Sequence, residues 1–195
     1  MTATRCDWAD GADERMRDYH DTEWGVPHHD DRALFELLTL EGAQAGLSWR
    51  TVLARREGYR ASYHGFNIER VAAMDDAELE GLLAGSPLIR NRLKIFSVRD
   101  NARAALAAIG THGSLDRYLW SFVDYTPVRN GWTDRGQVPA TTPVSDAMSK
   151  ALRKAGFRFV GSTICYAFMQ ATGMVDDHLV SCFRHGRGRC ARRGG

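Results

Sequence analysis

The chain has 195 residues, of which 44% are hydrophobic and 26% charged, so it is long enough to bury one sizeable core. The formal net charge is +2, but the last twelve residues hold five arginines and no acid; without those five charges, residues 1–183 carry −3. This balance excludes a strongly basic body, and any contact with nucleic acid must come from a local patch.

The chain has no uncharged apolar run of about 18 residues, and its first twenty residues lack the apolar stretch of a signal peptide. We therefore expect a cytoplasmic protein with no membrane partner. In a reducing compartment we expect the four cysteines to be free or metal-bound rather than paired in disulfides; they are Cys6, Cys165, Cys182 and Cys190.

The first clear helical pattern follows residues 30–31, two aspartates that can cap a run of leucines at helical spacing. This run includes an acid, Glu41, and ends in a break at Gly46. On spacing alone, Glu41 can be the solvated edge of an amphipathic helix and Gly46 its stop. Ser48 is expected to cap the next helix, which runs through Arg56.

Three further helices are predicted between residue 75 and residue 123. Asp75 and Glu78 form a capping-box pattern ahead of a leucine-rich segment. Residues 89–109 form a longer helical pattern that is expected to end at Gly110, and Ser114 opens another helix. Residues 124–143 contain three of the five prolines and are predicted to be one long loop.

After the loop, two helices joined by the sequence GFRFVG are predicted. Ser145 is expected to cap the first, which ends near Lys154, with Gly156 just after it and Gly161 before the second. The turn would leave backbone N–H groups free to bind a phosphate, and Arg158 adds positive charge beside them. An ordinary helical hairpin, whose glycines only permit a tight turn, remains an alternative.

These patterns predict a single compact all-α domain spanning residues 1–183, followed by a basic tail, residues 184–195, that is expected to be disordered.

A possible metal site links the two ends of the predicted domain. If the segment is helical, His178 and Cys182 lie one turn apart on one face, and Cys6 and His20 are the natural donors to complete a tetrahedral zinc site. On spacing alone this signal is weak, because the gaps match no compact zinc finger.

Several segments resemble one enzyme family. They are RCDWAD, YHDTEWGVP, LFELLTLEGAQAGLSW, LIRNRLKI and SKALRKAGFRFVGSTICYAFMQATGMVDDH with its following cysteine. Together they resemble the DNA-3-methyladenine glycosylase I family of the helix-hairpin-helix DNA glycosylases, in order over residues 5–182, with only the long loop and the tail left out. The resemblance implies a DNA-binding hairpin at GFRFVG and a structural zinc on the matching positions Cys6, His20, His178 and Cys182.

The resemblance also implies a pocket for a damaged base. Glu41 matches the family's base-contacting acid, Tyr19 and Trp49 match stacking positions, and Trp8 and Trp24 are expected to line the pocket. Alkylation at N3 makes adenine cationic, so aromatic faces and one carboxylate are the suitable partners. On this interpretation the apolar run carries an acid because the acid faces a bound base.

The break after Glu41 resembles the family's DNA wedge. Gly46 would let the backbone approach the duplex, and Leu47 would enter the gap that a flipped nucleotide leaves. The implied activity is monofunctional excision of 3-methyladenine from double-stranded alkylated DNA, by hydrolysis of the N-glycosidic bond after base flipping, in base excision repair. The expected enzyme is a monomer without an organic cofactor.

Asp176 departs from the family pattern, which usually has asparagine at this position. It can stabilise an oxocarbenium ion, as a carboxylate does in other helix-hairpin-helix glycosylases, or it can cap a helix that carries His178. Ser162 and Thr163 stand where lyase relatives have a lysine, so no β-elimination is expected. Two other functions remain open: a broader-specificity alkylbase glycosylase that uses Asp176, and a non-catalytic, zinc-stabilised DNA-binding module.

Overall fold

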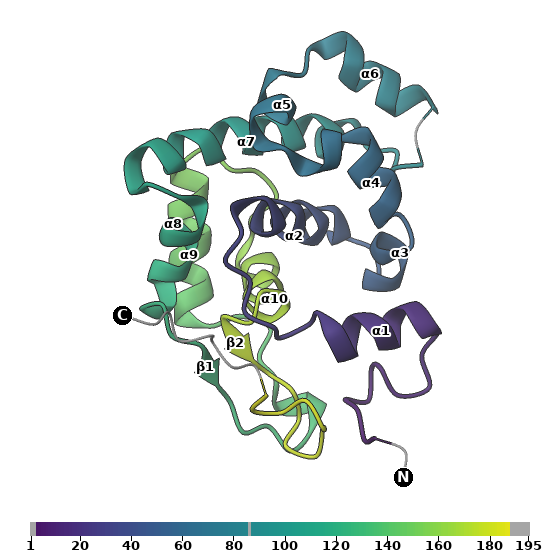
Figure 1. Cartoon of the computed structure of the whole chain (residues 1–195), viewed down its shortest axis with the longest axis vertical. Helices are drawn as coiled ribbons and strands as arrows, with labels where there is room; N and C mark the ends of the chain where they lie inside the picture. Colours follow the sequence, from purple (N-terminus) through teal and green to yellow (C-terminus); the bar gives the residue numbers. More distant parts are fainter. Residues whose placement is uncertain (1–2, 86, 188–195) are drawn as a thin grey trace.

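The structure is a computed structural model that describes residues 3–85 and 87–187, and helices dominate it (Figure 1). Its α-helices are, in chain order, α1 (Glu14–Thr22), α2 (Asp31–Gln44), α3 (Trp49–Leu53), α4 (Arg56–Ser62), α5 (Ile68–Ala73), α6 (Asp76–Gly85), α7 (Arg92–His112), α8 (Leu115–Trp120), α9 (Pro143–Lys154) and α10 (Ser162–Ala171). Shorter elements are the 3-10 helices η1 (His64–Phe66), η2 (Ser121–Val123) and η3 (Arg135–Gln137) and the strands β1 (Val128–Arg129) and β2 (Val175–Asp176). Among the described helices, none is both long and apolar enough to cross a membrane.

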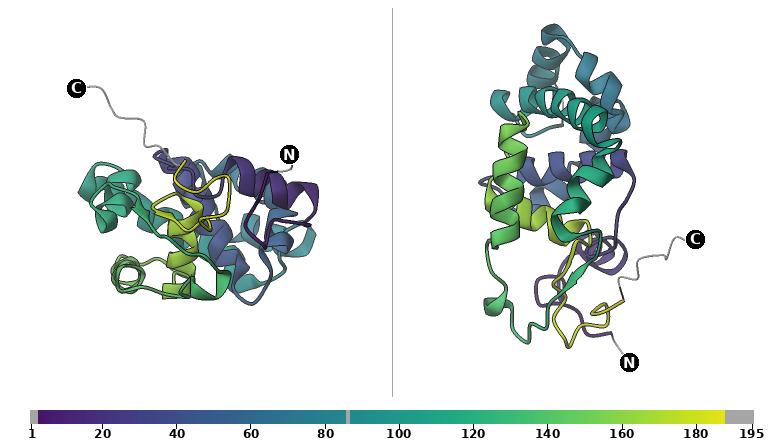
Figure 2. Two further views of the ribbon diagram at one scale, coloured as in Figure 1. Left: turned by 90° about the horizontal axis from the view of Figure 1, so that it is seen from below. Right: turned by 90° about the vertical axis from the view of Figure 1, so that its left-hand side faces the viewer.

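Helix α2 lies at the centre of the molecule, where it packs against α3, α7, α8 and α10 (Figures 1 and 2). Every residue of α2 from position 34 to position 43 is buried. Its apolar side chains belong to the main hydrophobic core, and each fully buried leucine or phenylalanine there contributes roughly 1.5–3 kcal/mol to folding. Because all sides of this stretch are covered, the two acids within it, Glu36 and Glu41, are also removed from water.

The predicted helix starts at Asp30, Asp75 and Ser114 are confirmed. The side chains of Asp30 and Ser114 each accept a hydrogen bond from a backbone N–H group in the first turn. Asp75 and Glu78 form a reciprocal capping box, in which each side chain accepts from the other residue's backbone N–H, at 2.8 and 2.9 Å. Local hydrogen bonding therefore suffices to fix these three helix ends.

The helix predicted to run from Ser48 through Arg56 is wrong in its extent. Ser48 does cap α3, accepting from a backbone N–H at 3.2 Å. The backbone then leaves the helical region before α4 begins. Arg56, at the start of α4, forms ion pairs with Glu23 and with Glu36 of α2, and these tertiary contacts set the direction of the second helix.

Two other predicted helix boundaries are also wrong. The long helix α7 is capped by Asn91 and ends at Gly113, whose φ of +87° is the left-handed conformation that favours glycine, whereas Gly110 lies inside the helix. Helix α9 is capped by Thr142 rather than Ser145. Ser145 sits three residues further on and completes a capping box with Thr142, so both side chains help to start the helix.

The fold is mostly helical and forms one compact body, but it is not purely α. Within residues 124–143, predicted to be one loop, β1 pairs in parallel with β2, Val128 opposite Val175, and η3 forms a further turn. The predicted helix carrying His178 and Cys182 is wrong, because the chain runs through turns after β2. The pairing of β2 with β1, a contact between distant parts of the sequence, sets the path of this segment.

The start of the predicted tail contacts the domain. The backbone N–H of Gly186 donates to Asp176 at 2.8 Å, and the ring of His185 lies 3.0 Å from the carbonyl oxygen of Asn130. Residues 188–195 lie outside the described residues, so a disordered tail stays a prediction for that part of the chain.

Candidate active site

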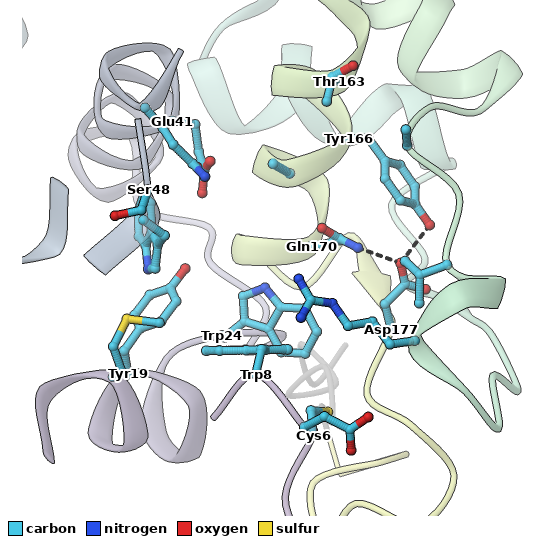
Figure 3. Close-up of a pocket in the computed structure, with 18 of the residues that line it drawn as sticks. Cys6, Trp8, Tyr19, Trp24, Glu41, Ser48, Thr163, Tyr166, Gln170 and Asp177 are labelled. Atoms are coloured by element: carbon cyan, nitrogen blue, oxygen red, sulfur yellow. Dashed lines mark hydrogen bonds between the residues drawn. The ribbon is translucent and has the colours of Figure 1, made fainter. Parts of the chain in front are cut away.

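A cavity of about 570 Å³ opens between α1, α2, α3, α10 and the loop that contains η3 (Figure 3). Its volume is typical of a site for a small molecule or a single base. All five residues predicted to form a base pocket line it: Trp8, Tyr19, Trp24, Glu41 and Trp49. The structure therefore brings together residues of α1, α2 and α3 and of the segments before and after α1.

Glu41 is the central acid of this cavity. Its side chain is only 4% exposed, and its Oε2 atom has no hydrogen-bond partner among the described residues. Burial raises the pKa of Glu41 to about 8. The alternative of Glu41 as the solvated edge of an amphipathic helix is therefore wrong.

Two other polar atoms beside Glu41 also lack a partner among the described residues: the hydroxyl of Tyr19 and the indole N–H of Trp49. The rings of Tyr19 and Trp49 lie 5.1 Å apart between centroids. In Figure 3, the Glu41 carboxyl group and the Tyr19 hydroxyl point into the same space. Burial, with a further contribution from Glu41, raises the pKa of Tyr19 well above its usual value, so the hydroxyl remains a donor. Buried polar groups are rarely left unpaired, and such a trio is suited to bind a polar, planar guest.

Trp8 and Trp24 form the wall of the cavity opposite Glu41. Their rings meet edge to face at 5.1 Å between centroids. On their other side they contact a second buried cluster, since Trp8 lies 5.1 Å from the ring of His20 and Trp24 lies 4.5 Å from the ring of His178. The two tryptophans thus connect the cavity with the predicted metal ligands.

The second cluster contains the four residues predicted to bind metal, and all four are buried. Their ligand atoms lie within 4.8 Å of one another; the residues are Cys6, His20, His178 and Cys182. Sulfur-to-nitrogen distances between neighbouring ligands are 3.5–3.6 Å. Four inward-facing thiol and imidazole groups at this spacing are able to hold one metal ion.

The surroundings of the cluster orient its ligands. Asp21 contacts the second ring nitrogen of His20 at 2.8 Å and is itself held by Arg5 through three hydrogen bonds. The carbonyl oxygen of Trp24 contacts the second ring nitrogen of His178 at 3.1 Å. Burial lowers the pKa of His178 to about 4, so its ring is neutral, as a metal ligand must be.

Asp177, which sequence reasoning missed, lines the cavity at the end away from Glu41. Its carboxylate accepts four hydrogen bonds of 2.6–2.7 Å, from the side chains of Asn130, Trp132, Tyr166 and Gln170. These donors come from both the long loop and α10. Asp177 thus joins the long loop to α10, and both of its carboxylate oxygens already accept hydrogen bonds from within the protein.

Asp176, singled out from the sequence, does not line this cavity. Its carboxylate accepts from the backbone N–H groups of His178 and Gly186 and lies 3.9 Å from Arg129. It therefore caps a turn rather than a helix. Asp176 is the last residue of β2 and Asp177 follows it, so the two neighbouring carboxylates have different surroundings.

The predicted wedge is exposed on the loop between α2 and α3. Gly46 has a φ of +77° and no atom within 4 Å of where a side chain would begin, and the Leu47 side chain is 42% exposed. The ammonium group of Lys94 donates to the carbonyl oxygens of Ala43 and Ala45 at 2.9 and 2.6 Å. Lys94, on α7, thus fixes the end of α2 from which Leu47 projects.

The turn between α9 and α10 contains the predicted phosphate-binding residues. Gly156 has a φ of +94°, and Gly161 precedes α10 with no side chain that caps its first turn. Arg158 is exposed and forms an ion pair with Asp100 at 3.0 Å. Asn101 holds the backbone of Arg158 through both its N–H and its carbonyl oxygen, at 2.7 and 3.1 Å. α7 therefore positions both this turn and the wedge.

Comparisons with known proteins show which family the chain belongs to. A family model described as methyladenine glycosylase matches residues 8–185. DNA-3-methyladenine glycosylase 1 of Escherichia coli (strain K12) is 48% identical over 178 residues, which cover 91% of this chain and 95% of that protein. A crystal structure of 3-methyladenine DNA glycosylase I has a TM-score of 0.89 at 50% identity and covers 93% of this chain and 100% of that one. A crystal structure of a variant of 3-methyladenine DNA glycosylase I in complex with 3-methyladenine has a TM-score of 0.87 at 32% identity. The match covers 89% of this chain and 94% of that one. The resemblance seen in the sequence is confirmed: the chain belongs to the methyladenine glycosylase family.

Proposed function

We propose that the protein is a monofunctional DNA glycosylase that excises 3-methyladenine from double-stranded alkylated DNA, as the first step of base excision repair. One observation carries this proposal: three buried polar atoms that have no partner in the described part of the chain, on Tyr19, Glu41 and Trp49, line an aromatic cavity of suitable size. Two of the similar proteins support the choice of base: one is a DNA-3-methyladenine glycosylase, and the other was solved in complex with 3-methyladenine.

Recognition would begin when the damaged nucleotide leaves the base stack and enters the cavity. Tyr19 and Trp49 would stack on the base, with Trp8 and Trp24 closing the cavity around it. N3 alkylation gives the base in DNA a positive charge. A cation in this place favours the ionised form of Glu41 and offsets the unfavourable burial of its carboxylate, so normal bases are disfavoured.

The chemistry needs little more than this arrangement. The alkylated base is already a good leaving group, because its departure neutralises the ring. Glu41 would bind the base edge and stabilise positive charge as the N-glycosidic bond breaks, while water attacks the sugar carbon and leaves an abasic site. Ser162 and Thr163, which follow Gly161, offer no amine for a Schiff base, which is consistent with hydrolysis and no lyase step.

DNA would be held at two places on the surface. Leu47, with Gly46 allowing close approach, would enter the duplex at the vacated position. The turn between α9 and α10 would bind phosphate through free backbone N–H groups near Gly161 and through Arg158, with Gly156 shaping the turn. Gly46, Leu47, Gly156 and Arg158 are exposed, which this role requires.

We propose that the metal is a structural zinc. With Zn–S bonds of about 2.3 Å and Zn–N bonds of about 2.0–2.1 Å, a tetrahedral site places sulfur and nitrogen ligands about 3.5 Å apart, which agrees with the measured 3.5–3.6 Å. Zinc would be held by Cys6, His20, His178 and Cys182 and would join the two ends of the chain. No position is left for a substrate, so its contribution is to stability.

Two alternatives are weaker. The position of Asp176 outside the cavity argues against a broader glycosylase that uses it as the catalytic carboxylate. A non-catalytic DNA-binding module would have no need of the unpaired trio around Glu41. We further propose that the enzyme acts as a cytoplasmic monomer and needs no organic cofactor.

The test is release of free bases from methylated duplex DNA, resolved by chromatography. Wild type should release 3-methyladenine but not 7-methylguanine. Glu41→Gln should slow release roughly 100- to 1,000-fold, the loss typical of a group that stabilises charge in the transition state. Release of 7-methylguanine as well would favour the broader enzyme, and DNA binding without any release by the folded protein would favour the binding module.

A further inference from the structure

The wall of the cavity contributed by the long loop was not predicted from the sequence. Residues from this loop line the cavity beside the base-binding aromatic rings: Arg135, Val138, Pro139 and Ala140. Among them, Arg135 carries the only charge. The family resemblance in the sequence did not extend to this loop, so a role for its residues must come from the geometry.

The loop is fastened to the cavity by specific hydrogen bonds. The side chains of Asn130 and Trp132 both donate to one oxygen of Asp177 at 2.7 Å. The other oxygen of Asp177 is held from α10 by Tyr166 and Gln170 (Figure 3). A loop anchored in this way is able to place a side chain at a fixed point of the cavity.

The turn that carries Arg135 is also fixed. Asp134 accepts from the backbone N–H of Gly136 at 2.7 Å, and Gln137 accepts from the backbone N–H groups of Thr133 and Asp134 at 2.8 and 3.3 Å. This capping box closes η3 around the exposed Arg135. The conformation of the turn is therefore set before any ligand binds.

Arg135 forms no ion pair with any residue that the structure describes, although Asp7 and Asp177 line the same cavity. Arg50, the other arginine at the cavity, lies 3.3 Å from a carboxylate oxygen of Asp13. In the part of the chain that the structure describes, no carboxylate lies within ion-pair distance of Arg135. A guanidinium group that forms no ion pair beside a cavity is able to bind an anionic ligand there.

We propose that Arg135 binds a phosphate that flanks the flipped nucleotide at the mouth of the cavity. This inference rests on the proposed function. A cationic base is repelled by a guanidinium group, whereas a phosphate enters with every flipped nucleotide and suits the planar donor fork of arginine. Since residues 1–183 carry a net negative charge, attraction to DNA must come from cations placed locally, and Arg135 is an exposed cation on the lining of the cavity.

The experiment measures binding to a duplex that contains a tetrahydrofuran abasic-site analogue, over a series of salt concentrations. Arg135→Gln should weaken binding about tenfold at low salt and reduce the slope of log affinity against log salt by about 0.9, the value for one lost phosphate contact. Arg117→Gln is the matched control: this exposed arginine lies on α8, across the molecule from α3 (Figure 1), and should leave the slope unchanged. Melting temperatures check that both variants fold.

Affinity for free 3-methyladenine separates the phosphate from the base. The proposal predicts that Arg135→Gln binds the free base as wild type does. An unchanged salt slope would overturn the proposal, and weaker free-base binding with an unchanged slope would show that Arg135 faces the base instead. Absence of 3-methyladenine release by wild type would count against the proposed function, while the salt slope would still decide whether Arg135 contacts phosphate.

Discussion

Two clusters of buried polar groups lie on either side of Trp8 and Trp24, and they differ in one respect. In the cluster of Cys6, His20, His178 and Cys182, every candidate ligand atom faces another one, and the second ring nitrogens of the histidines contact Asp21 and the Trp24 carbonyl. In the cavity, the polar atoms of Tyr19, Glu41 and Trp49 have no partner among the described residues. One bound ion would satisfy all four groups of the Cys/His cluster, which suits a structural role. The polar atoms of the cavity are satisfied only when a ligand binds there.

The same contrast is seen within α2, between two acids five residues apart. Glu36 is buried but forms ion pairs with Arg56 and Arg60. Glu41 is buried without a charged partner among residues 3–85 and 87–187, and burial raises its pKa to about 8. Glu36 holds α4 against α2 through its ion pairs. Glu41 lowers the stability of the fold, and its unpaired carboxyl group is available to bind a ligand in the cavity.

The largest expected effect concerns the metal. Structural zinc contributes roughly 10–16 kcal/mol in small zinc proteins, which is as large as the whole stability of a typical domain. Cys182→Ser should therefore lose bound zinc and unfold at a much lower temperature, and a strong chelator should do the same to wild type. Cys165→Ser is the matched control, since Cys165 is buried in α10 outside the cluster and its variant should keep its zinc. Metal content by mass spectrometry and thermal melting check this, and a metal-free wild type that melts normally would contradict it.

The second prediction is that the two buried acids of α2, Glu36 and Glu41, have opposite effects on stability and on base excision when replaced. Glu36→Gln should lower stability by roughly 3 kcal/mol, because it leaves the buried charge of Arg56 less compensated, and should leave base excision by the folded enzyme close to normal. Glu41→Gln should abolish most excision without lowering stability. Urea unfolding and base-release rates measured on the same two variants decide this; loss of stability in Glu41→Gln would argue that Glu41 is structural.

The third prediction is a pH dependence of stability. In the unfolded chain Glu41 ionises at its ordinary pKa near 4.5, whereas in the folded protein it keeps its proton to about pH 8. The folded state therefore binds more protons between these values, so the stability of wild type should fall relative to Glu41→Gln as the pH rises from 4.5 to 8, by roughly 3–5 kcal/mol in total. Parallel stability curves for the two proteins over this range would show that Glu41 is not buried as an unpaired acid.

The smallest expected effect is at the wedge. Leu47→Ala should reduce the rate of excision from duplex DNA by about tenfold, since less of the unstacked gap is filled, and should leave stability unchanged within about 0.5 kcal/mol. Val128→Ala is the matched control, because that side chain is equally exposed, at 43% against 42%, but lies on β1. Equal rates for the two variants on duplex substrate would remove Leu47 from the account.

Local sequence signals predicted those features that depend on neighbouring residues. The caps at Asp30, Ser48 and Ser114 are confirmed because each is a hydrogen bond within a few residues of the chain. The pocket residues and metal ligands are found together as expected, but their assembly was predicted from a family resemblance. Spacing alone left both sites open.

The features that were missed depend on contacts between distant segments. His178 and Cys182 converge through turns set by the pairing of β1 with β2, which no helical spacing describes. Asp177 was overlooked in favour of its neighbour Asp176, because its role depends on side chains of the long loop and of α10 that local sequence does not place beside it. Lys94 gave no signal of its contact with the end of α2, since its partners are backbone carbonyl groups 49 and 51 residues away.

The most direct test of the account is calorimetric titration of free 3-methyladenine into wild type and Glu41→Gln, with Glu36→Gln as the control. If the unpaired trio is the base-binding element, wild type and Glu36→Gln should bind the base with similar affinity, and Glu41→Gln should bind it at least tenfold more weakly. Equal affinity in wild type and Glu41→Gln would contradict the central claim that the unpaired acid of α2 is there to bind the base.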